Sequence, residues 1–411
     1  MIFCIDMKSF FASVECSLRK LNPMTTPLVV CDESRGKGAL IMATSPILKK
    51  RGIASRCRLF EIPSDVKCIK AKPRMKKYIE YAGVIHNIFL KYVSCDDIHT
   101  YSIDESFLDV SSYLKYYGVT PKELALKILG VIKESLGIIA VCGAGDNLFM
   151  AKVALDLYAK HDDDLFFYLS LEYFKKVTWY HDKLTDIWQI GNGISKRLNK
   201  LGLYNLSCIA SCDVEILKKE FGIIGVDLFN RSWGIDDVKI SDIKAYKPDS
   251  KSMSRSQVLF RDYTKEEAWI VLCEMIYLLC VDLVRNNLAC GNVFFGVYYN
   301  DDNATGKSFC LDYYSNDYFY IKNNIKRRYF TYVECCKIRV ISIGFSSLVD
   351  EKNKIINLFD LDTGRFFDLS KSIIEIWERF GKNKIVLGTA CLEESTLYLR
   401  NGCIGGHNSD V

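Results

Sequence analysis

Three acidic residues have the chemistry and the placement of ligands for divalent cations. Asp104 and Glu105 are adjacent in Tyr101-Ser-Ile-Asp-Glu-Ser-Phe-Leu-Asp-Val-Ser111, a stretch typical of a β-strand or hairpin, and Asp6 ends the apolar N-terminal strand. Neighbouring side chains of a strand point to opposite faces, so we predict a turn at Asp104-Glu105 that directs both carboxylates toward Asp6. Such carboxylates suit Mg²⁺, and three of them could hold two ions roughly 3.5 to 4 Å apart for in-line phosphoryl displacement. Asp109, beyond the turn, is expected to be structural or solvated.

The surrounding pattern predicts an α+β sheet that would position these acids. Helical periodicity is expected over Met7–Leu21 and Arg74–Val93, and Thr120-Pro-Lys-Glu123 is a capping box that opens a helix to about Leu136. The later elements are a strand at residues 138–142, a helix at 147–160 and a strand at 165–169. This order, with a basic, turn-rich insertion between Thr26 and Lys77, favours a ferredoxin-like sheet with helices on one face.

The remainder of the chain predicts a helical region and a second α+β domain. Residues 170–234 are expected to be helical, with Ile190-Gly-Asn-Gly193 between short helices at 184–188 and 194–201. A polar linker follows at residues 236–251. Beyond it we predict strands at 255–260, 292–299 and 337–345, and a helix at 264–288 opened by the capping box Thr264-Lys-Glu-Glu267.

Composition favours a folded intracellular protein. The 411 residues carry a formal charge of +5, a weak indication of an anionic partner, and the 17 cysteines form no C-x-x-C pair or zinc-type cluster, as expected of reduced thiols. The first apolar run stops at Asp6, so no signal peptide is expected, and Trp269–Leu283 is interrupted by Glu274 and Asp282, so no membrane span is expected. Ser34-Arg-Gly-Lys-Gly38 lacks the P-loop pattern, which argues against an ATPase.

Three motifs in order resemble the Y-family translesion DNA polymerases, and the UmuC-like branch fits best. They are Ile5-Asp-Met-Lys-Ser-Phe-Phe-Ala-Ser-Val-Glu15, Tyr101-Ser-Ile-Asp-Glu-Ser-Phe107 and Asn147-Leu-Phe-Met-Ala-Lys152, and the similarity extends to Ser55–Pro63 and Arg400–His407. The resemblance implies a right-hand polymerase with a palm (1–10 and 74–169), small fingers (11–73), a helical thumb (170–235), a linker (236–251), a little finger (252–350) and a C-terminal extension (351–411). It also implies low-fidelity translesion synthesis from dNTPs on primer–template DNA in DNA repair, in the cytoplasm at the nucleoid, as part of an SOS-type damage response.

The resemblance assigns roles to individual residues of the predicted catalytic site. Asp6, Asp104 and Glu105 match the catalytic ligands of two Mg²⁺ ions, with the backbone carbonyl of Met7 as a further ligand. Phe11 matches the steric gate that excludes a ribose 2′-hydroxyl, with Phe10 beside it in the nucleotide site. The triphosphate contacts implied are Lys152, Thr44 and one of Lys50 and Arg51, a choice left open because Ile47 replaces the usual aromatic residue.

Further motifs predict contacts to DNA and to a sliding clamp. Ile190-Gly-Asn-Gly193 resembles a helix-hairpin-helix, in which backbone N–H groups of Gly191 and Gly193 would hold a DNA phosphate. Two groups in the second domain suit backbone contacts to duplex DNA, namely Ser252, Ser254 and Arg255, and Lys326, Arg327 and Arg328. Ile355-Ile-Asn-Leu-Phe359 resembles a clamp-binding peptide, with Ile in place of its glutamine.

Two alternatives share parts of this pattern. A catalytically inactive, UmuC-like DNA-binding or regulatory protein would keep the fold, but the intact Asp6, Asp104 and Glu105 argue against it. A two-metal nuclease would use the same carboxylate chemistry. Only the order of the motifs distinguishes a nuclease from a polymerase at the level of sequence.

Overall fold

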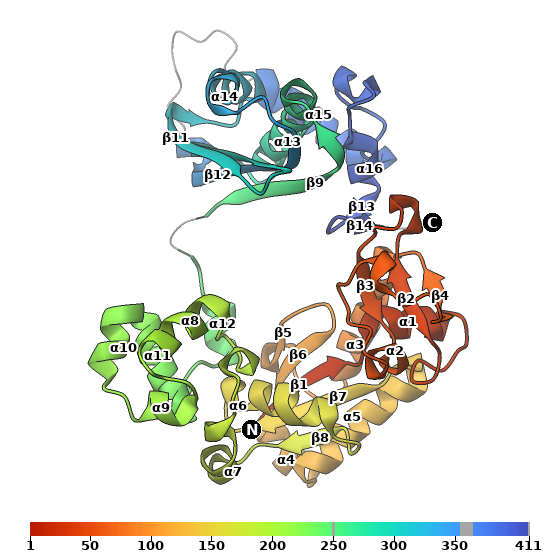
Figure 1. The fold of residues 1–411 in the computed structure, drawn as a ribbon, viewed down its shortest axis with the longest axis vertical. Helices are drawn as coiled ribbons and strands as arrows, with labels where there is room; N and C mark the ends of the chain where they lie inside the picture. The colour runs from red at the N-terminus through yellow and green to blue at the C-terminus, as the bar shows by residue number, and fades with distance from the viewer. Residues whose placement is uncertain (249–250, 354–364, 410–411) are drawn as a thin grey trace. The chain divides into compact units, whose positions relative to one another are not determined.

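The chain folds into two compact units, Met1–Tyr246 and Lys247–Ser409 (Figure 1). The computed structural model describes residues 1–248, 251–353 and 365–409. The boundary between the units lies within the segment predicted as a polar linker. Part of that segment is helical, because α12 (Ile240–Ala245) buries Ile240 in an apolar cluster of the N-terminal unit. Within the described residues, no helix is long and apolar enough to cross a membrane.

A five-stranded sheet forms the centre of the N-terminal unit. In spatial order its strands are β5 (Ile98–Thr100), β6 (Glu105–Asp109), β1 (Ile2–Met7), β7 (Ala140–Gly145) and β8 (Phe166–Tyr168). β1 pairs antiparallel with both β6 and β7, whereas β7 and β8 are parallel. β1 and β7 are nearly continuous apolar runs, as expected of central strands that are covered on both faces.

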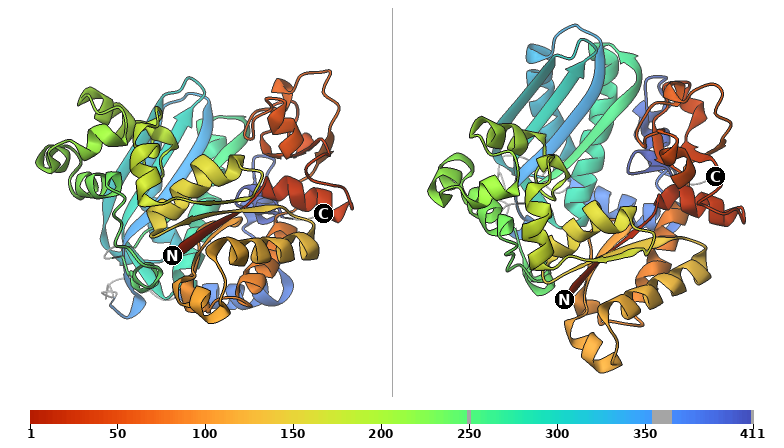
Figure 2. Two further views of the ribbon diagram at one scale, coloured as in Figure 1. Left: turned by 90° about the horizontal axis from the view of Figure 1, so that it is seen from below. Right: turned by 60° about the horizontal axis from the view of Figure 1, so that its bottom comes forward.

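Helices cover both faces of this sheet, so the prediction of helices on one face was wrong in that respect (Figure 2). α3 (Met75–Phe89) and α5 (Pro121–Leu136) lie on one face; α6 (Leu148–Val153) and the π-helical turn Ala154–Tyr158 lie on the other. Two glycines of β7 allow the second layer to form. A Cβ at Gly143 would lie 2.2 Å from the backbone nitrogen of Leu155, and one at Gly145 would lie 2.5 Å from that of Ala151. The backbone of α6 therefore rests directly on the sheet.

Local sequence explains several helix boundaries. The predicted capping boxes are confirmed at α5, where Thr120 and Glu123 exchange hydrogen bonds, and at α13 (Lys265–Arg285), where Thr264 and Glu267 do so. The predicted helix at residues 147–160 is instead divided into α6, the π-helical turn and a final 3₁₀ turn, Ala159–His161. A π-helical turn adds one residue to a helix and so changes which side chains share a face.

Two smaller substructures complete the N-terminal unit. The first consists of α1 (Phe10–Leu18) and the insertion, which contains α2 (Pro46–Lys50) and a three-stranded sheet of β3 (Ile41–Thr44), β2 (Leu28–Cys31) and β4 (Ile69–Ala71). α4 (Ser111–Tyr117) follows β6. The helical region has its own apolar core and consists of α7 (Leu171–Lys176), α8 (Asn192–Lys200), α9 (Leu206–Ala210), α10 (Val214–Phe221) and α11 (Ile223–Ser232).

The C-terminal unit is a four-stranded antiparallel sheet with helices on one face. Its strands, in order, are β11 (Ala304–Ser315), β10 (Leu288–Tyr299), β12 (Ile338–Asp350) and β9 (Met253–Tyr263). α13 and α14 (Tyr318–Tyr332) share a core with the inward side chains of the sheet, and α15 (Arg365–Phe380) adds Phe366, Ile373 and Trp377 to it. α16 (Leu397–Asn401) and the hairpin β13–β14 (Cys403–Ile404, His407–Asn408) follow. The other face of the sheet exposes Ser254, Ser256 and Phe294.

Candidate active site

The register of two strands brings the three acids to one edge of the sheet. Asp6 and Glu105 are directly opposite one another on β1 and β6, so their side chains share a face. The hairpin before β6 ends at Asp104, whose backbone oxygen accepts a hydrogen bond of 3.0 Å from the Met7 N–H. The loop is closed by Tyr101 and Ser102, which both donate backbone N–H groups to the Glu105 carbonyl oxygen. Residues almost one hundred positions apart in sequence are thus adjacent in space.

Glu105 is buried and paired with a lysine of α6. The Lys152 ammonium lies 2.8 Å from the Glu105 carboxylate, and both side chains are less than a tenth exposed. The Cys4 thiol donates a hydrogen bond of 3.2 Å to Glu105 Oε1, because Cys4 precedes Asp6 by two positions and faces the same way. Burial raises the pKa of the Cys4 thiol well above its usual range, which keeps it protonated as a donor.

Asp6 is paired with a second lysine, Lys160, which the sequence analysis missed. Lys160 Nζ lies 3.4 Å from Asp6 Oδ2, and Asp156 bridges the two lysines at 2.8 Å from Lys160 and 3.0 Å from Lys152. Burial raises the pKa of Asp6 to about 6; Lys160 opposes this rise, and Asp104 and Glu105 increase it. The repeat of charged residues at positions 152, 156 and 160 was the available signal for Lys160.

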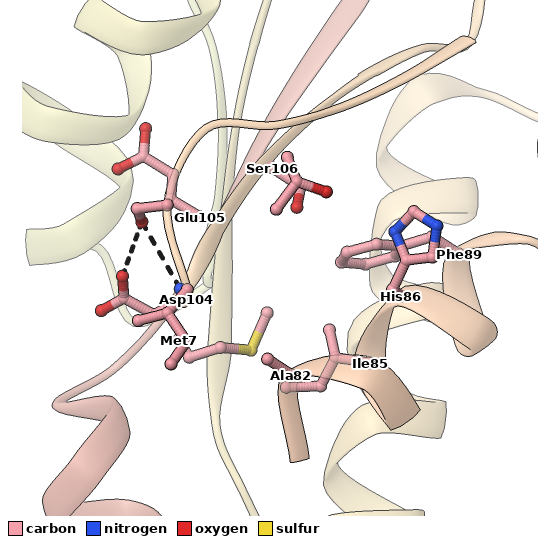
Figure 3. A pocket seen from close by; sticks show the side chains of 11 residues that line it. Met7, Ala82, Ile85, His86, Phe89, Asp104, Glu105 and Ser106 are labelled. Atoms are coloured by element: carbon pink, nitrogen blue, oxygen red, sulfur yellow. Dashed lines mark hydrogen bonds between the residues drawn. The ribbon is translucent and has the colours of Figure 1, made fainter. Parts of the chain in front are cut away.

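Asp104 is half-buried and borders a small cavity. Ser102 Oγ donates to Asp104 Oδ1 at 2.7 Å and accepts the Asp104 N–H. The cavity, of about 30 Å³, has Asp104 and Glu105 at one end and His86 and Phe89 of α3 at the other, and the Met7 thioether points toward α3 (Figure 3). Within the described residues, no three acidic, histidine or cysteine side chains are arranged as a preformed metal site.

Asp109 accepts hydrogen bonds from Ser111 and is structural.

The predicted nucleotide-contacting aromatics lie at the start of α1. Phe11 is half-buried, and its ring stacks on Tyr78 of α3 with centroids 4.6 Å apart. Phe10 is buried and touches Phe11 at a tilted angle. Thr44 is fully buried at the end of β3, where its hydroxyl donates to the Ala54 carbonyl oxygen at 3.4 Å. The structure therefore groups Phe11 with Tyr78, a residue that the sequence analysis had not singled out.

On α2, the basic residue that interacts electrostatically with the acids is not one of the two predicted from the sequence. Lys49, which was not predicted as a site residue, interacts with Asp6 and Asp104. Desolvation lowers the pKa of its ammonium group, and the negative charges of these two acids oppose that shift. Lys49 and the two predicted alternatives, Lys50 and Arg51, are all exposed. Lys152 and Lys160 pair directly with the carboxylates, and Lys49 interacts electrostatically with Asp6 and Asp104.

Comparisons with known proteins identify the family. Residues 5–156 match the model of the impB/mucB/samB family, and residues 250–358 match the model of that family's C-terminal domain. UvrX of Bacillus subtilis, whose name assigns it to UV-damage repair, is 31% identical over 418 residues, which cover 99% of this chain and 97% of UvrX. The chain belongs to the impB/mucB/samB family.

Other relatives and solved structures agree with this family assignment. Two proteins named DNA polymerase IV 2, from Bacillus subtilis and Halalkalibacterium halodurans, are each 28% identical, with 99% of this chain and 98% of each relative covered. A Y-family DNA polymerase chimera of Dbh and Dpo4 has a TM-score of 0.63 at 22% identity, covering 87% of this chain and 99% of the chimera. The resemblance to UmuC-like Y-family polymerases and the predicted α+β polymerase fold are confirmed.

In this impB/mucB/samB protein, the glycine-rich turn of the helical region lies at the start of α8. Gly191 is its N-cap and Gly193 is in its first turn, and a Cβ at either position would have no neighbour within 4 Å. The helix predicted at residues 184–188 is only a 3₁₀ turn, Leu184–Asp186. The turn therefore has the exposed backbone of a helix N-terminus but a shorter first helix than the resemblance implied.

The predicted DNA-contacting residues of the C-terminal unit lie on two sides of its sheet. Ser254, which follows Ser252 by two residues, is on the open face, whereas Arg255 points toward α13 and pairs with Asp282. The second group, Lys326, Arg327 and Arg328, is on α14, which packs on the helical face. Arg328 stacks over Phe309 at 3.9 Å. The structure does not bring the two groups together, and Ile355–Phe359, the predicted clamp peptide, lies outside the described residues.

Proposed function

We propose that this chain is a DNA-directed DNA polymerase that extends a primer 3′-hydroxyl with dNTPs, at low fidelity and past damaged template bases, in DNA repair. The enzyme class follows from the family and from the relatives named DNA polymerase IV. The observation that carries the chemistry is the cross-strand pair of Asp6 and Glu105 with Asp104 at the adjoining turn. Carboxylates delivered by two strands of a rigid sheet supply positioning and charge stabilisation, which is most of what nucleotidyl transfer requires.

The donor set at this edge fits two Mg²⁺ ions. Asp6, Asp104, Glu105 and the Met7 carbonyl are all hard oxygen donors, the kind that Mg²⁺ prefers together with substrate phosphates. Bound there, the ions would lower the pKa of the primer hydroxyl and neutralise the triphosphate. Ammonium groups of Lys152 and Lys160 pair with Glu105 and Asp6 in the described structure, so positive charge orients both carboxyl groups.

The lysines around the acids suit a polyanionic substrate. The carboxylates form ion pairs with Lys152 and Lys160 and interact electrostatically with Lys49. When dications neutralise the carboxylates, these ammonium groups can pair with phosphate oxygens instead, as compact point charges. We assign the triphosphate to this side of the sheet edge and the sugar to Phe11, which acts as the gate against a 2′-hydroxyl.

The small size of the predicted fingers, residues 11–73, favours low fidelity. Their three-stranded sheet and α2 share a small apolar cluster that includes Val29, Ile41 and Leu48. Rejection of misshapen base pairs by induced fit requires a closing element that completes the site around a correct pair. Fingers of this size offer little surface for such closure, which favours acceptance of damaged templates.

Primer extension on undamaged and lesion-containing templates tests this proposal. The wild-type protein with Mg²⁺ should extend with dNTPs, and the near-isosteric variants Asp6→Asn and Glu105→Gln should lose at least about a thousandfold in rate, since each removes a charge that acts in the transition state. Equal extension by the variants would refute the site. Primer shortening without dNTPs would identify a nuclease, and DNA binding with no turnover would identify an inactive relative.

Two finer proposals concern partners and location. We propose a cytoplasmic, nucleoid-associated protein of the DNA-damage (SOS) response that contacts the sliding clamp through Ile355–Phe359. Leu358→Ala with Phe359→Ala should abolish capture by immobilised clamp, and Asn357→Ala is the matched control. Undiminished capture of the double variant would show that this peptide is not the contact.

A further inference from the structure

The ring of Phe11 rests on a buried tyrosine of another helix. Phe11 is on α1, and Tyr78 is on α3, sixty-seven positions later. Their ring centroids are 4.6 Å apart with an interplanar angle of 26°, a stacked arrangement, and Tyr78 is fully buried. Because protein interiors are close-packed, the Phe11 ring can retreat from a ligand only if Tyr78 moves as well.

The hydroxyl end of Tyr78 is fixed by a buried carboxylate. Tyr78 Oη donates to Glu15 Oε1 at 2.9 Å, and Arg74 donates to both Glu15 oxygens, at 3.0 and 2.6 Å. Arg19 also pairs with Glu15, whose side chain is fully buried. Burial opposes the charge on Glu15, but hydrogen bonds from Arg74, Arg19 and Tyr78 outweigh it and lower its pKa. The acceptor therefore stays ionised, and the tyrosine is held at both ends.

The two contacts repeat with helical spacing on both helices. Phe11 and Glu15 are four residues apart on α1; Arg74 and Tyr78 are four residues apart at the start of α3. Residues at this spacing lie on one face of a helix, so α1 and α3 meet through two matched pairs, Phe11 with Tyr78 and Glu15 with Arg74. The stack is thus part of the helix–helix contact and not a chance approach of two rings.

We propose that Tyr78 is the positioning residue that makes Phe11 a rigid barrier against ribonucleotides, an inference that rests on the proposed role of Phe11 as the sugar gate. A single half-buried ring could rotate or shift to accommodate one additional hydroxyl group. Stacked on a ring anchored by Glu15, it cannot do so without breaking buried hydrogen bonds, which are costly to leave unsatisfied. Selectivity for 2′-deoxyribonucleotides is therefore set by α3 as well as by α1.

Single-nucleotide incorporation by the full chain with Mg²⁺ tests this role. The measured quantity is the ratio of kcat/KM for a dNTP to that for the matching rNTP. Tyr78→Leu should lower the ratio by about tenfold or more, mainly through faster rNTP incorporation, because the Phe11 ring can then shift away from the 2′-hydroxyl. Tyr78→Phe keeps the stack but loses the hydrogen bond to Glu15, so it should lower the ratio less than Tyr78→Leu does. Tyr78→Met introduces a flexible side chain with no ring to stack on Phe11; it should also lower the ratio and serves as the second variant if Tyr78→Leu folds poorly.

Two controls separate this inference from its premise. Phe11→Ala must lower the ratio; if it does not, Phe11 is not the gate and the proposed sugar site fails. If Phe11→Ala lowers the ratio and both Tyr78→Leu and Tyr78→Met leave it unchanged, only the positioning role is overturned. Phe174→Leu removes a buried ring from the helical region, in an apolar cluster that includes neither Phe11 nor Tyr78. An equal loss of discrimination in Phe174→Leu would attribute the effect to general destabilisation and overturn the inference.

Discussion

Lys160 and Asp6 form an ion pair, with Nζ 3.4 Å from the carboxylate oxygen. Together with the pair of Lys152 and Glu105, it provides cations for two of the three acids at the sheet edge. The two ammonium groups therefore reduce the electrostatic repulsion among the acids. Asp156 contacts both lysines, so the two pairs form one connected network.

The raised pKa of Asp6, about 6 against an ordinary 3.8, predicts a pH-dependent stability in the absence of divalent metal. Because the folded state holds this proton more tightly, the group stabilises the fold below about pH 4, and that contribution is lost as pH rises through 6. Asp6→Asn should be more stable than wild type at pH 8, by about 1–3 kcal/mol, and equally stable near pH 4. Denaturant unfolding in EDTA at both pH values measures this, with Asp109→Asn as the control. A pH-independent difference would contradict the prediction.

Gly143→Ala should strongly destabilise the protein and abolish extension. The new Cβ would lie 2.2 Å from the Leu155 backbone nitrogen, so α6 would have to move off the sheet and carry Lys152 away from Glu105. A loss of about 3 kcal/mol or more is expected for overpacking against backbone. Gly130→Ala is the matched control, because it lies in α5 with nothing within 4 Å of its Cβ and should be neutral or stabilising by up to about 1 kcal/mol. Thermal unfolding of the two variants provides the comparison.

Lys152→Met should cost about 3–5 kcal/mol, because it leaves Glu105 buried without its partner charge. Adding Glu105→Gln should restore much of that stability, since no uncompensated charge remains, although the double variant should stay inactive. A double-mutant cycle from chemical denaturation measures the coupling between the two sites. Additive effects of the two substitutions would show that the pair contributes nothing to stability.

Lys49→Met should raise KM for dNTPs about tenfold and change kcat less, since a positive charge that binds the triphosphate in both ground and transition states contributes uniform binding. Lys50→Met and Arg51→Met, made on the same short helix, test the two residues that the motif left open. We expect each to have a smaller effect than Lys49→Met. Steady-state single-nucleotide kinetics distinguishes the three, and a dominant effect at Arg51 would restore the original assignment.

The sequence was sufficient for the parts of the fold that depend on local pattern. The apolar run that ends in Asp6, the capping boxes at Thr120 and Thr264, and the paired acids after Tyr101 each encode their element within a few residues. The ordered motifs then indicated the family. β11 and α14 were not predicted. In α14, apolar, aromatic and basic residues are mixed, so its sequence shows only weak amphipathic periodicity.

By itself, the sequence determined which acids gather and roughly where the chain turns, because strand periodicity and turn chemistry are properties of short segments. Only the tertiary structure decided what surrounds those acids. Lys160 reaches Asp6 through a π-helical turn that no periodicity signals, and Tyr78 reaches Phe11 through the packing of two helices. Gly143 matters because a helix lies on its strand. These are contacts between segments distant along the chain, and their geometry depends on close packing of the whole unit.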